Sequence, residues 1–222
     1  ISGLQQDCER YMQWVKSDPC FASIDFKVTP AKAHAFKKLN LRIKPEIVHA
    51  GLTHIKPYEK TAPHLDTTSF EKMRKDPNVT VLDARSNYEH RLGKFKNALT
   101  LDINHLRELP TQAHTLNHLK EKTIITYCTG GVKCEKVSAY LLEQGFKNVY
   151  QLKGGIIRYS QESDGSAFEG SCYVFDNRLS VPINKKKPSI ISKCHLCQAP
   201  CERMINCANT MCNKHTTICH PC

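Results

Sequence analysis

The chain has 222 residues, of which 40% are hydrophobic and 24% charged, a composition typical of soluble globular proteins. No run approaches the roughly 20 apolar residues that span a bilayer, and no basic segment followed by an apolar run indicates a signal peptide. The formal charge of +11 favours an anionic partner, and RNA is the obvious large polyanion. We therefore expect a soluble protein without a membrane partner.

The cysteines indicate a reducing compartment. Of the twelve cysteines, seven lie within residues 194–222, where they include two Cys-x-x-Cys pairs. This crowding is typical of metal binding rather than of a disulfide framework. We therefore expect a cytoplasmic protein.

The first predicted elements form a small, partial α+β unit over residues 1–50. Apolar residues at helical spacing predict a helix over 4–16. Alternating apolar residues predict strands over 21–28 and within 36–48. Two strands alone are marginal in water, so we expect the rest of this unit to lie upstream of the chain. Residues 51–65 are rich in Thr, His and Pro and lack periodicity, which predicts a linker.

A second domain is predicted over residues 66–171, where apolar strands alternate with helices. Thr68 or Ser69 is expected to cap its first helix. The predicted elements are a helix over 70–75, strands over 79–82 and 123–127, a helix over 134–144, a strand over 148–152 and a helix over 154–159. This alternation predicts an α/β fold with a mainly parallel sheet and helices on both faces. Such sheets place ligands at the carboxyl ends of their strands.

A Cys-rich segment is predicted over residues 172–222, beginning with a short strand over 173–175. It ends in two Cys-x-x-Cys pairs separated by 21 residues, namely Cys194 with Cys197 and Cys219 with Cys222. Four thiolates at this spacing can surround one tetrahedral zinc ion. Further candidate ligands are Cys201, Cys207 and Cys212, and spacing alone leaves open how the ligands divide. A segment with so few large apolar residues cannot fold on its own core, so we predict that the zinc is structural.

The strongest candidate for chemistry is the thiol of Cys128. It directly follows a buried strand and precedes two glycines and the start of a helix. Backbone N–H groups at such a position stabilise a thiolate, which predicts a lowered pKa and nucleophilic character. The amides that would form this anion-binding loop belong to Thr129, Gly130, Gly131 and Val132. Lys133 adds positive charge at the rim. The alternative is a buried Cys without a chemical role, but the paired glycines favour function.

Two stretches resemble signatures of the rhodanese superfamily. The first consists of Asp83-x-Arg85, followed by Tyr88-Glu89-His90, Gly93 and Asn97-Ala98. The second is the Cys128 loop, which resembles the rhodanese active-site loop. Related phosphatases carry Arg six residues after the cysteine, where this chain has Cys134. Hydrolysis of phosphate esters is therefore disfavoured.

Three further segments resemble a more specific family within this superfamily. Residues 127–136, Gly154-Gly155-Ile156-Ile157 and Tyr173-Val174-Phe175-Asp176 are similar to the rhodanese-related tRNA uridine hydroxylases, as is the Cys-rich tail. The resemblance implies a ferredoxin-like or acylphosphatase-like half-domain before the rhodanese domain. It also implies an enzyme that oxidises wobble uridine in tRNA to 5-hydroxyuridine with oxygen. A eukaryotic branch of these relatives is named thiosulfate sulfurtransferase-like.

The resemblance also implies roles for individual residues. Cys128 would be the nucleophile or a persulfide carrier, and Lys133 would hold anions. The family loop usually has Arg at the position of Lys133, and Lys cannot form the bidentate fork of a guanidinium. Asp83 and Arg85 would brace the loop, although a strand-end cap and a surface ion pair are equally good interpretations. Cys134 is interpreted as a core residue or as a resolving thiol.

Three functions stay open at this point. The first is hydroxylation of tRNA uridine through Cys128. The second is transfer of sulfur from thiosulfate or another donor through a Cys128 persulfide. The third is a non-catalytic, zinc-stabilised module that binds protein or RNA, which normal function after Cys128→Ser would favour. Contacts of the tail with RNA would use Lys185, Lys186, Lys187 and Lys193.

Overall fold

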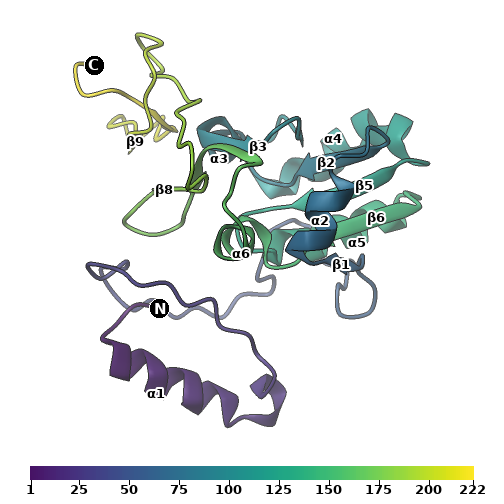
Figure 1. Cartoon of the computed structure of the whole chain (residues 1–222), viewed down its shortest axis with the longest axis horizontal. Coiled ribbons are helices and arrows are strands. Elements are labelled where there is room, and N and C mark those ends of the chain that lie inside the picture. Colours follow the sequence, from purple (N-terminus) through teal and green to yellow (C-terminus); the bar gives the residue numbers. More distant parts are fainter. The chain divides into compact units, whose positions relative to one another are not determined.

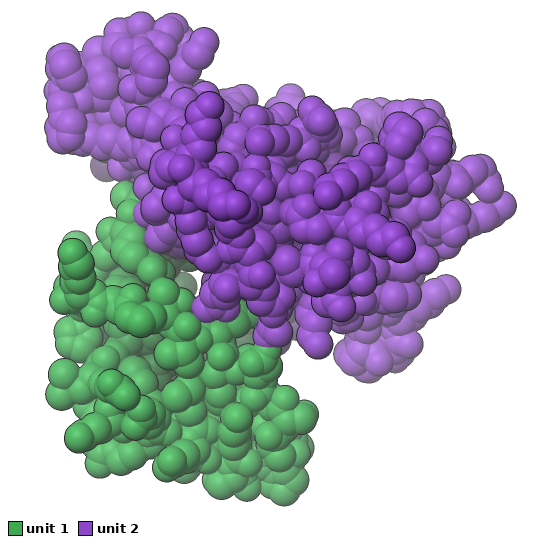
Figure 2. Space-filling model, in the orientation of Figure 1, with its two compact units in different colours: residues 1–44, 175–179 green, residues 45–174, 180–222 purple.

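The computed structural model describes residues 1–222 and divides into two compact units (Figure 2). The first unit comprises residues 1–44 with 175–179, and the second comprises residues 45–174 with 180–222. No helix is both long enough and apolar enough to span a bilayer.

The first unit contains one α-helix and no strand. α1 spans Gln5–Lys16, as predicted, and a 3₁₀ helix follows over Pro19–Phe21 (Figure 1). The strands predicted over 21–28 and within 36–48 were wrong, because these segments are irregular. A strand needs a neighbouring strand for its N–H and C=O groups, and this unit contains no strand. No side chain within residues 1–44 is buried.

The second unit is built on a five-stranded sheet in which every pair of neighbours is parallel. Its strand order is β1-β6-β5-β2-β4. The strands are β1 (His64–Leu65), β2 (Val79–Asp83), β4 (Leu99–Thr100), β5 (Thr123–Tyr127) and β6 (Asn148–Leu152). Continuous apolar runs suit strands that are covered on both faces, and the predicted α/β class is confirmed.

Helices cover the sheet on both sides (Figure 1). The side chain of Ile124 packs into a cluster with α5, whereas its neighbour Ile125 packs with Phe70 of α2 and Ile156 of α6. The helices are α2 (Thr67–Met73), α3 (Asn87–Leu92), α4 (Leu109–Gln112), α5 (Val132–Glu143) and α6 (Gly155–Glu162), with 3₁₀ helices over Leu106–Glu108 and Ala113–Leu119.

The predicted cap of α2 was wrong. The helix is capped by Asp66, whose carboxylate accepts a hydrogen bond from the Ser69 amide at 2.7 Å. Thr68 and Ser69 both lie inside the helix. An ionised carboxylate is as good a cap as a hydroxyl, so composition alone did not choose between neighbouring candidates.

Residues 51–65, predicted as a linker, belong to the core of the second unit. Leu52, Ile55 and Ala62 are buried in the same cluster as α5. The carbonyl of Ile55 accepts a hydrogen bond from Lys136, and that of Ala62 accepts one from Gln151. The segment shows no periodicity in sequence because isolated apolar residues, rather than one face of a helix or strand, make these contacts.

A small antiparallel sheet and a two-stranded hairpin complete the unit. The sheet contains β3 (Gly93–Phe95), β7 (Phe168–Tyr173) and β8 (Ser180–Pro182), and the hairpin contains β9 (Met204–Asn206) and β10 (His215–Thr217). The strand predicted over 173–175 was wrong, because β7 ends at Tyr173. The sequence of β7 includes Gly170 and lacks regular apolar alternation, which hid it from pattern analysis.

Candidate active site and metal centre

The loop after β5 holds Cys128 at the carboxyl end of the sheet. The Gly131 amide donates a hydrogen bond to the Cys128 sulfur at 3.2 Å. Gly131 adopts a left-handed conformation with φ of 91° and forms the N-cap of α5. The expected turn of amides toward the sulfur is therefore present at Gly131, and the left-handed backbone explains why glycine stands there.

The amino end of α6 holds the other side of this loop. The amides of Ile156 and Ile157 donate to the carbonyls of Cys128 and Thr129, each at 3.0 Å. A Cβ atom on Gly155 would lie 2.3 Å from the Cys128 carbonyl oxygen, so no larger residue fits there. The loop is thereby fixed between the amino ends of α5 and α6.

The surroundings of Cys128 favour its thiolate. A hydrogen bond from the Cys134 side chain is the main cause that lowers the pKa of Cys128 to about 7, and burial opposes it. The Cys134 amide, the charge of Lys133 and the Gly131 amide lower the pKa further. Cys128 is 2% exposed. A thiol with this pKa is substantially ionised at neutral pH, which is the state that acts as a nucleophile.

Lys133 lies at the loop, where its positive charge is paired with a carboxylate. Its ammonium group is 2.6 Å from the carboxylate of Glu89, which is completely buried. The same carboxylate receives the Ser86 amide and contacts the Thr129 hydroxyl at 3.5 Å. Glu89 therefore joins both ends of the loop to α3. Sequence analysis quoted Glu89 within a signature but gave it no role, because its partners are about 40 residues away along the chain.

Asp83 and Arg85 form a completely buried pair beneath the loop. The Arg85 side chain donates to both Asp83 carboxylate oxygens, at 2.9 and 2.7 Å, and to the Gly93 carbonyl at 2.7 Å. The Tyr127 hydroxyl donates to Asp83 at 2.5 Å. Since Tyr127 directly precedes Cys128, the pair ties the ends of β2 and β5 together. Asp83 also caps the end of β2, since its carboxylate accepts the Arg85 amide at 3.0 Å, whereas the ion pair is buried rather than at the surface.

Three aromatic rings connect the Cys-rich tail to the active-site region. Tyr88, Tyr173 and His215 lie edge to face, with ring centroids 5.1 to 5.3 Å apart. Tyr88 precedes Glu89, and the Tyr173 carbonyl contacts the Thr129 hydroxyl at 3.5 Å. Burial raises the pKa of the Tyr88 hydroxyl well above its usual range. The sequence gave no signal for this cluster, because its members come from three separate elements.

The two Cys-x-x-Cys pairs come together in the tail. The sulfur atoms of Cys194, Cys197, Cys219 and Cys222 all lie within 4.8 Å of one another, and those of Cys197 and Cys219 are 3.5 Å apart. In a regular tetrahedron with zinc–sulfur bonds of about 2.3 Å, the sulfur atoms lie about 3.8 Å apart. The four thiols therefore fit one tetrahedral metal ion. Cys201, Cys207 and Cys212 lie outside this group.

The four thiols differ in their electrostatics. Hydrogen bonds from the Cys197 and Cys219 amides lower the pKa of Cys194 to about 6. Hydrogen bonding among the neighbouring sulfur atoms, led by Cys219, raises the pKa of Cys222 to about 12. Four thiolates at this distance repel one another unless a cation lies between them. The donor set is thus suited to a metal ion that accepts sulfur ligands.

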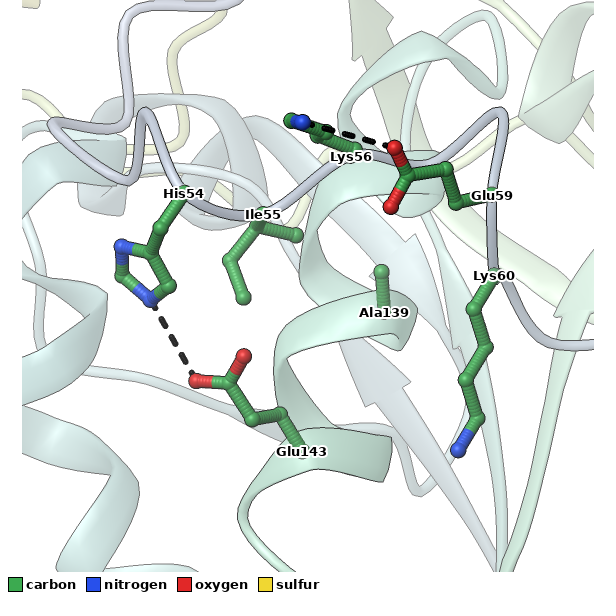
Figure 3. Close-up of a pocket in the computed structure, with 7 residues that line it drawn as sticks. All are labelled: His54, Ile55, Lys56, Glu59, Lys60, Ala139 and Glu143. Carbon is green, nitrogen blue, oxygen red and sulfur yellow. Dashed lines mark hydrogen bonds and ion pairs between the residues drawn. The ribbon is translucent and has the colours of Figure 1, made fainter.

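A surface hollow of about 270 Å³ lies elsewhere, beside the second half of α5 (Figure 3). His54 pairs with Glu143 at 3.3 Å, and Lys56 pairs with Glu59 at 3.4 Å. Because it lies away from the amino end of α5, this hollow is not part of the Cys128 site.

Family models match three consecutive parts of the chain. Residues 1–47 match the UPF0176 acylphosphatase like domain, residues 66–162 the rhodanese-like domain, and residues 169–222 the model described as Rhodanase C-terminal. These matches confirm the expected acylphosphatase-like N-terminal segment, rhodanese-like domain and Cys-rich C-terminal segment, although the predicted strands of the first segment are absent.

Curated relatives match almost the whole chain. A tRNA uridine(34) hydroxylase of Cytophaga hutchinsonii is 51% identical over 222 residues, which is 100% of this chain and 71% of the relative. The proteins of the same name from Onion yellows phytoplasma and Streptococcus pyogenes serotype M12 are 41% and 43% identical. They cover 99% and 96% of this chain, and 72% and 68% of their own lengths are matched.

Solved structures match a smaller part of the chain. A rhodanese-like domain from Anabaena sp. is 24% identical with a TM-score of 0.40, covering 49% of this chain and 79% of that domain. A rhodanese-related protein from Thermoplasma volcanium is 22% identical with a TM-score of 0.38, covering 46% of this chain and 93% of that protein.

Proposed function

This chain belongs to the tRNA uridine(34) hydroxylase family, and we propose that it hydroxylates uridine 34 of tRNA, at carbon 5 and with dioxygen, through the thiol of Cys128. The observation that carries the proposal is the position of this thiol. It lies at the carboxyl end of β5, accepts the Gly131 amide and is fixed between two helix termini. This placement suits a nucleophile that meets a nucleobase at the edge of a parallel sheet.

The neighbouring residues have supporting roles in this proposal. Thr129, Gly130, Gly131 and Val132 form the loop around the sulfur. Lys133, held by Glu89, keeps positive charge beside the thiolate. Asp83 and Arg85 act as positioning residues, because their buried pair fixes Tyr127 and hence the start of the loop. The pair acts on the loop indirectly, through the hydrogen bond from Tyr127 to Asp83.

The metal in this proposal is Zn²⁺, bound by Cys194, Cys197, Cys219 and Cys222. Zinc suits four thiolate ligands because it is a borderline-soft ion with a tetrahedral preference. Its role is structural, since four protein ligands leave no open position for a substrate.

The polyanionic substrate accounts for the charge of +11. Two tail lysines are already engaged within the protein, since Lys185 donates to the Ser163 carbonyl and Lys186 pairs with Asp164 at 2.7 Å. Lys187 and Lys193 are exposed, and we assign them to phosphate contacts. We also propose a cytoplasmic location, which a tRNA substrate and a set of free thiols support.

The proposal is tested by nucleoside mass spectrometry of tRNA from cells that lack the protein. The cells are complemented with the full-length wild type, with Cys128→Ser or with Cys172→Ser. Wild type and Cys172→Ser should restore 5-hydroxyuridine derivatives, whereas Cys128→Ser should not, because a hydroxyl is a far weaker nucleophile than a thiolate. The purified Cys128→Ser protein should lose at least about 1000-fold in initial rate.

Two other results would contradict the proposal. Equal restoration by Cys128→Ser would show that the thiol has no part in the reaction. An unchanged hydroxyuridine pool in all strains, together with a loss of thiolated nucleosides, would favour sulfur transfer.

A further inference from the structure

One histidine of the Cys-rich tail contacts two aromatic rings beside the Cys128 loop. His215 lies in β10, and its ring meets the rings of Tyr88 and Tyr173 edge to face, with centroids 5.3 Å apart in both contacts. Tyr88 and Tyr173 are also edge to face with each other, at 5.1 Å. The three rings therefore form one closed cluster, to which β10 of the tail, α3 and the end of β7 each contribute one member.

The hairpin of the tail fixes the direction of the His215 ring. His215 stands opposite Asn206 in the register of β9 and β10, and its Nδ1 atom is hydrogen-bonded to the Asn206 side chain. Its Nε2 atom is shielded from solvent and has no hydrogen-bond partner. Packing of the rings, rather than a hydrogen bond, therefore joins His215 to the two tyrosines. Edge-to-face contacts of this kind favour one relative orientation of the rings.

The two tyrosines adjoin the two groups that contact Thr129. Tyr88 directly precedes Glu89, whose carboxylate lies 3.5 Å from the Thr129 hydroxyl. Tyr173 contacts the same hydroxyl with its own carbonyl oxygen, also at 3.5 Å. Because Thr129 directly follows Cys128, a shift of either tyrosine moves a group that touches the loop immediately after the thiol.

Glu89 extends this connection to the other end of the loop. Its second carboxylate oxygen lies 2.6 Å from the Lys133 ammonium group and also accepts the Ser86 amide. Glu89 is completely buried, so close packing around α3 determines where its carboxylate lies. The turn of α3 that carries Tyr88 thus contacts the loop on both sides of the paired glycines, at Thr129 and at Lys133.

We propose that His215 is a positioning residue for Cys128, which acts through Tyr88 and Tyr173 on the residues that flank the thiol. In this proposal the Cys-rich tail is part of the active site. The His215 ring closes the aromatic cluster, and the cluster fixes α3 and the end of β7 against Thr129. The loop then keeps the Gly131 amide at the sulfur. The inference rests on the proposed function for its effect on hydroxylation, whereas its effect on the thiol does not.

The chain offers a matched control and a second way to break the same contact. Met211 belongs to the same hairpin, between β9 and β10, and its side chain is 94% exposed. Met211→Ala therefore changes the tail without touching the ring cluster. Tyr88→Leu removes the contact from the α3 side and leaves the sequence of the tail unchanged.

The test measures alkylation of Cys128 in the full-length protein. Reduced protein is treated with iodoacetamide between pH 5 and 10, and modification of tryptic peptide 123–133 is followed by mass spectrometry. This peptide contains Cys128 as its one cysteine. The variants are His215→Ala, His215→Phe, Tyr88→Leu, the double variant of His215→Ala with Tyr88→Leu, and Met211→Ala. Zinc per chain is measured for each variant, because it reports separately on the fold of the tail.

His215→Ala should raise the midpoint of alkylation by at least about half a pH unit, because a looser loop holds the Gly131 amide less closely at the sulfur. The value of kcat for hydroxylation should fall by at least about threefold, in line with the smaller thiolate fraction. His215→Phe should restore both values, since a phenyl ring keeps the edge-to-face contacts. Met211→Ala should match the wild type.

The double variant tests whether His215 acts through Tyr88. Tyr88→Leu should raise the midpoint at least as much as His215→Ala, and the double variant should shift it no further than Tyr88→Leu alone, because both substitutions remove the same contact. This comparison holds even if His215→Ala loses its zinc, since Tyr88→Leu leaves the tail sequence intact.

An unchanged midpoint in His215→Ala, or shifts that add in the double variant, would overturn the inference and leave the proposed function intact. Absence of 5-hydroxyuridine from the wild-type reaction, with the shifts in alkylation present, would instead overturn the proposed function and leave the role of His215 intact.

Discussion

Two regions of the second unit, the Cys128 loop and the Cys-rich tail, place cysteine sulfur atoms in contrasting environments. At the loop, a buried and rigid backbone surrounds Cys128, and its amides and Cys134 stabilise one negative charge. In the tail, four sulfur atoms crowd together, and only Cys194, Cys201 and Ile218 are buried in the small adjoining cluster. The fold thus stabilises the thiolate at the loop, whereas the four sulfur atoms of the tail form a group suited to holding a metal ion.

Removal of the metal should have the largest effect on folding. This effect should be confined to the Cys-rich tail. Structural zinc sites of this kind contribute on the order of 10 kcal/mol to folding, more than the small tail cluster can replace. A strong chelator should therefore expose the amides of β9 and β10 to hydrogen exchange and leave those of β5 and α5 protected. Metal analysis of the untreated protein should give one zinc per chain.

The matched variant for this comparison is Cys197→Ser, with Cys212→Ser as control, because Cys212 is exposed and lies outside the group. Cys197→Ser should release the zinc, and Cys212→Ser should retain it. Unaltered exchange in β9 and β10 after complete loss of zinc would show that the tail folds without the ion.

The pH dependence of alkylation should separate Cys128 from an ordinary thiol. Its pKa of about 7 lies below the usual value, so the reactive thiolate should appear as the pH rises through 7 and be lost below it. At pH 7 about half of Cys128 is ionised, compared with about 1% of a thiol with a pKa near 9. The measurement is the iodoacetamide rate of peptide 123–133 between pH 5 and 10.

The control is the same peptide in denatured protein, in which the midpoint should move up toward that of an ordinary thiol. The free energy of unfolding should also rise as the pH rises through this range. Because the folded-state pKa is lowered, the contribution of Cys128 is fully present above the unfolded pKa and is lost as the pH falls through 7. Equal midpoints in folded and denatured protein would contradict the described environment.

Glu89→Gln should have an intermediate effect. The substitution keeps the side-chain shape but removes the charge that holds Lys133 at 2.6 Å. We expect kcat/KM to fall about tenfold and unfolding to require about 1 to 3 kcal/mol less free energy, because a partly buried ammonium group loses its partner. Steady-state kinetics and urea denaturation measure the two effects. Glu169→Gln, on β7, is a control. An equal loss of kcat/KM and stability in this variant would show that Glu89 has no specific role.

The smallest effect should come from single tail lysines. Lys187→Ala should weaken tRNA binding several-fold and reduce the salt slope by about one ion, because one phosphate contact is lost. Lys186→Ala should do less, since Lys186 already pairs with Asp164. Filter binding at several salt concentrations measures both variants. A larger loss for Lys186→Ala would contradict the assignment of Lys187.

The features that sequence analysis predicted well are local ones. The end of β5 before Cys128, the glycine turn and the start of α5 follow from about ten consecutive residues, and so does each Cys-x-x-Cys pair. Cys134, interpreted from sequence as a core residue or a resolving thiol, is completely buried in the core cluster that also contains Cys128.

The features that sequence analysis missed depend on distant partners. Glu89 gains its role only because α3 packs beside the Cys128 loop. His215 meets Tyr88 only after the tail has folded back. The strands predicted over 21–28 and within 36–48 show the converse failure, because alternation in sequence cannot supply a neighbouring strand.

The chain that precedes β1 has a practical consequence for dividing this protein. The rhodanese-like match begins at residue 66, but a protein cut there would lack β1 at the sheet edge and the side chains of Leu52, Ile55 and Ala62. It would expose apolar side chains of α5 that belong to the same core cluster. It would also leave Lys136 without Glu46, its ion-pair partner at 2.9 Å. A minimal soluble fragment should therefore begin at Pro45, where the second unit starts, rather than at the family boundary.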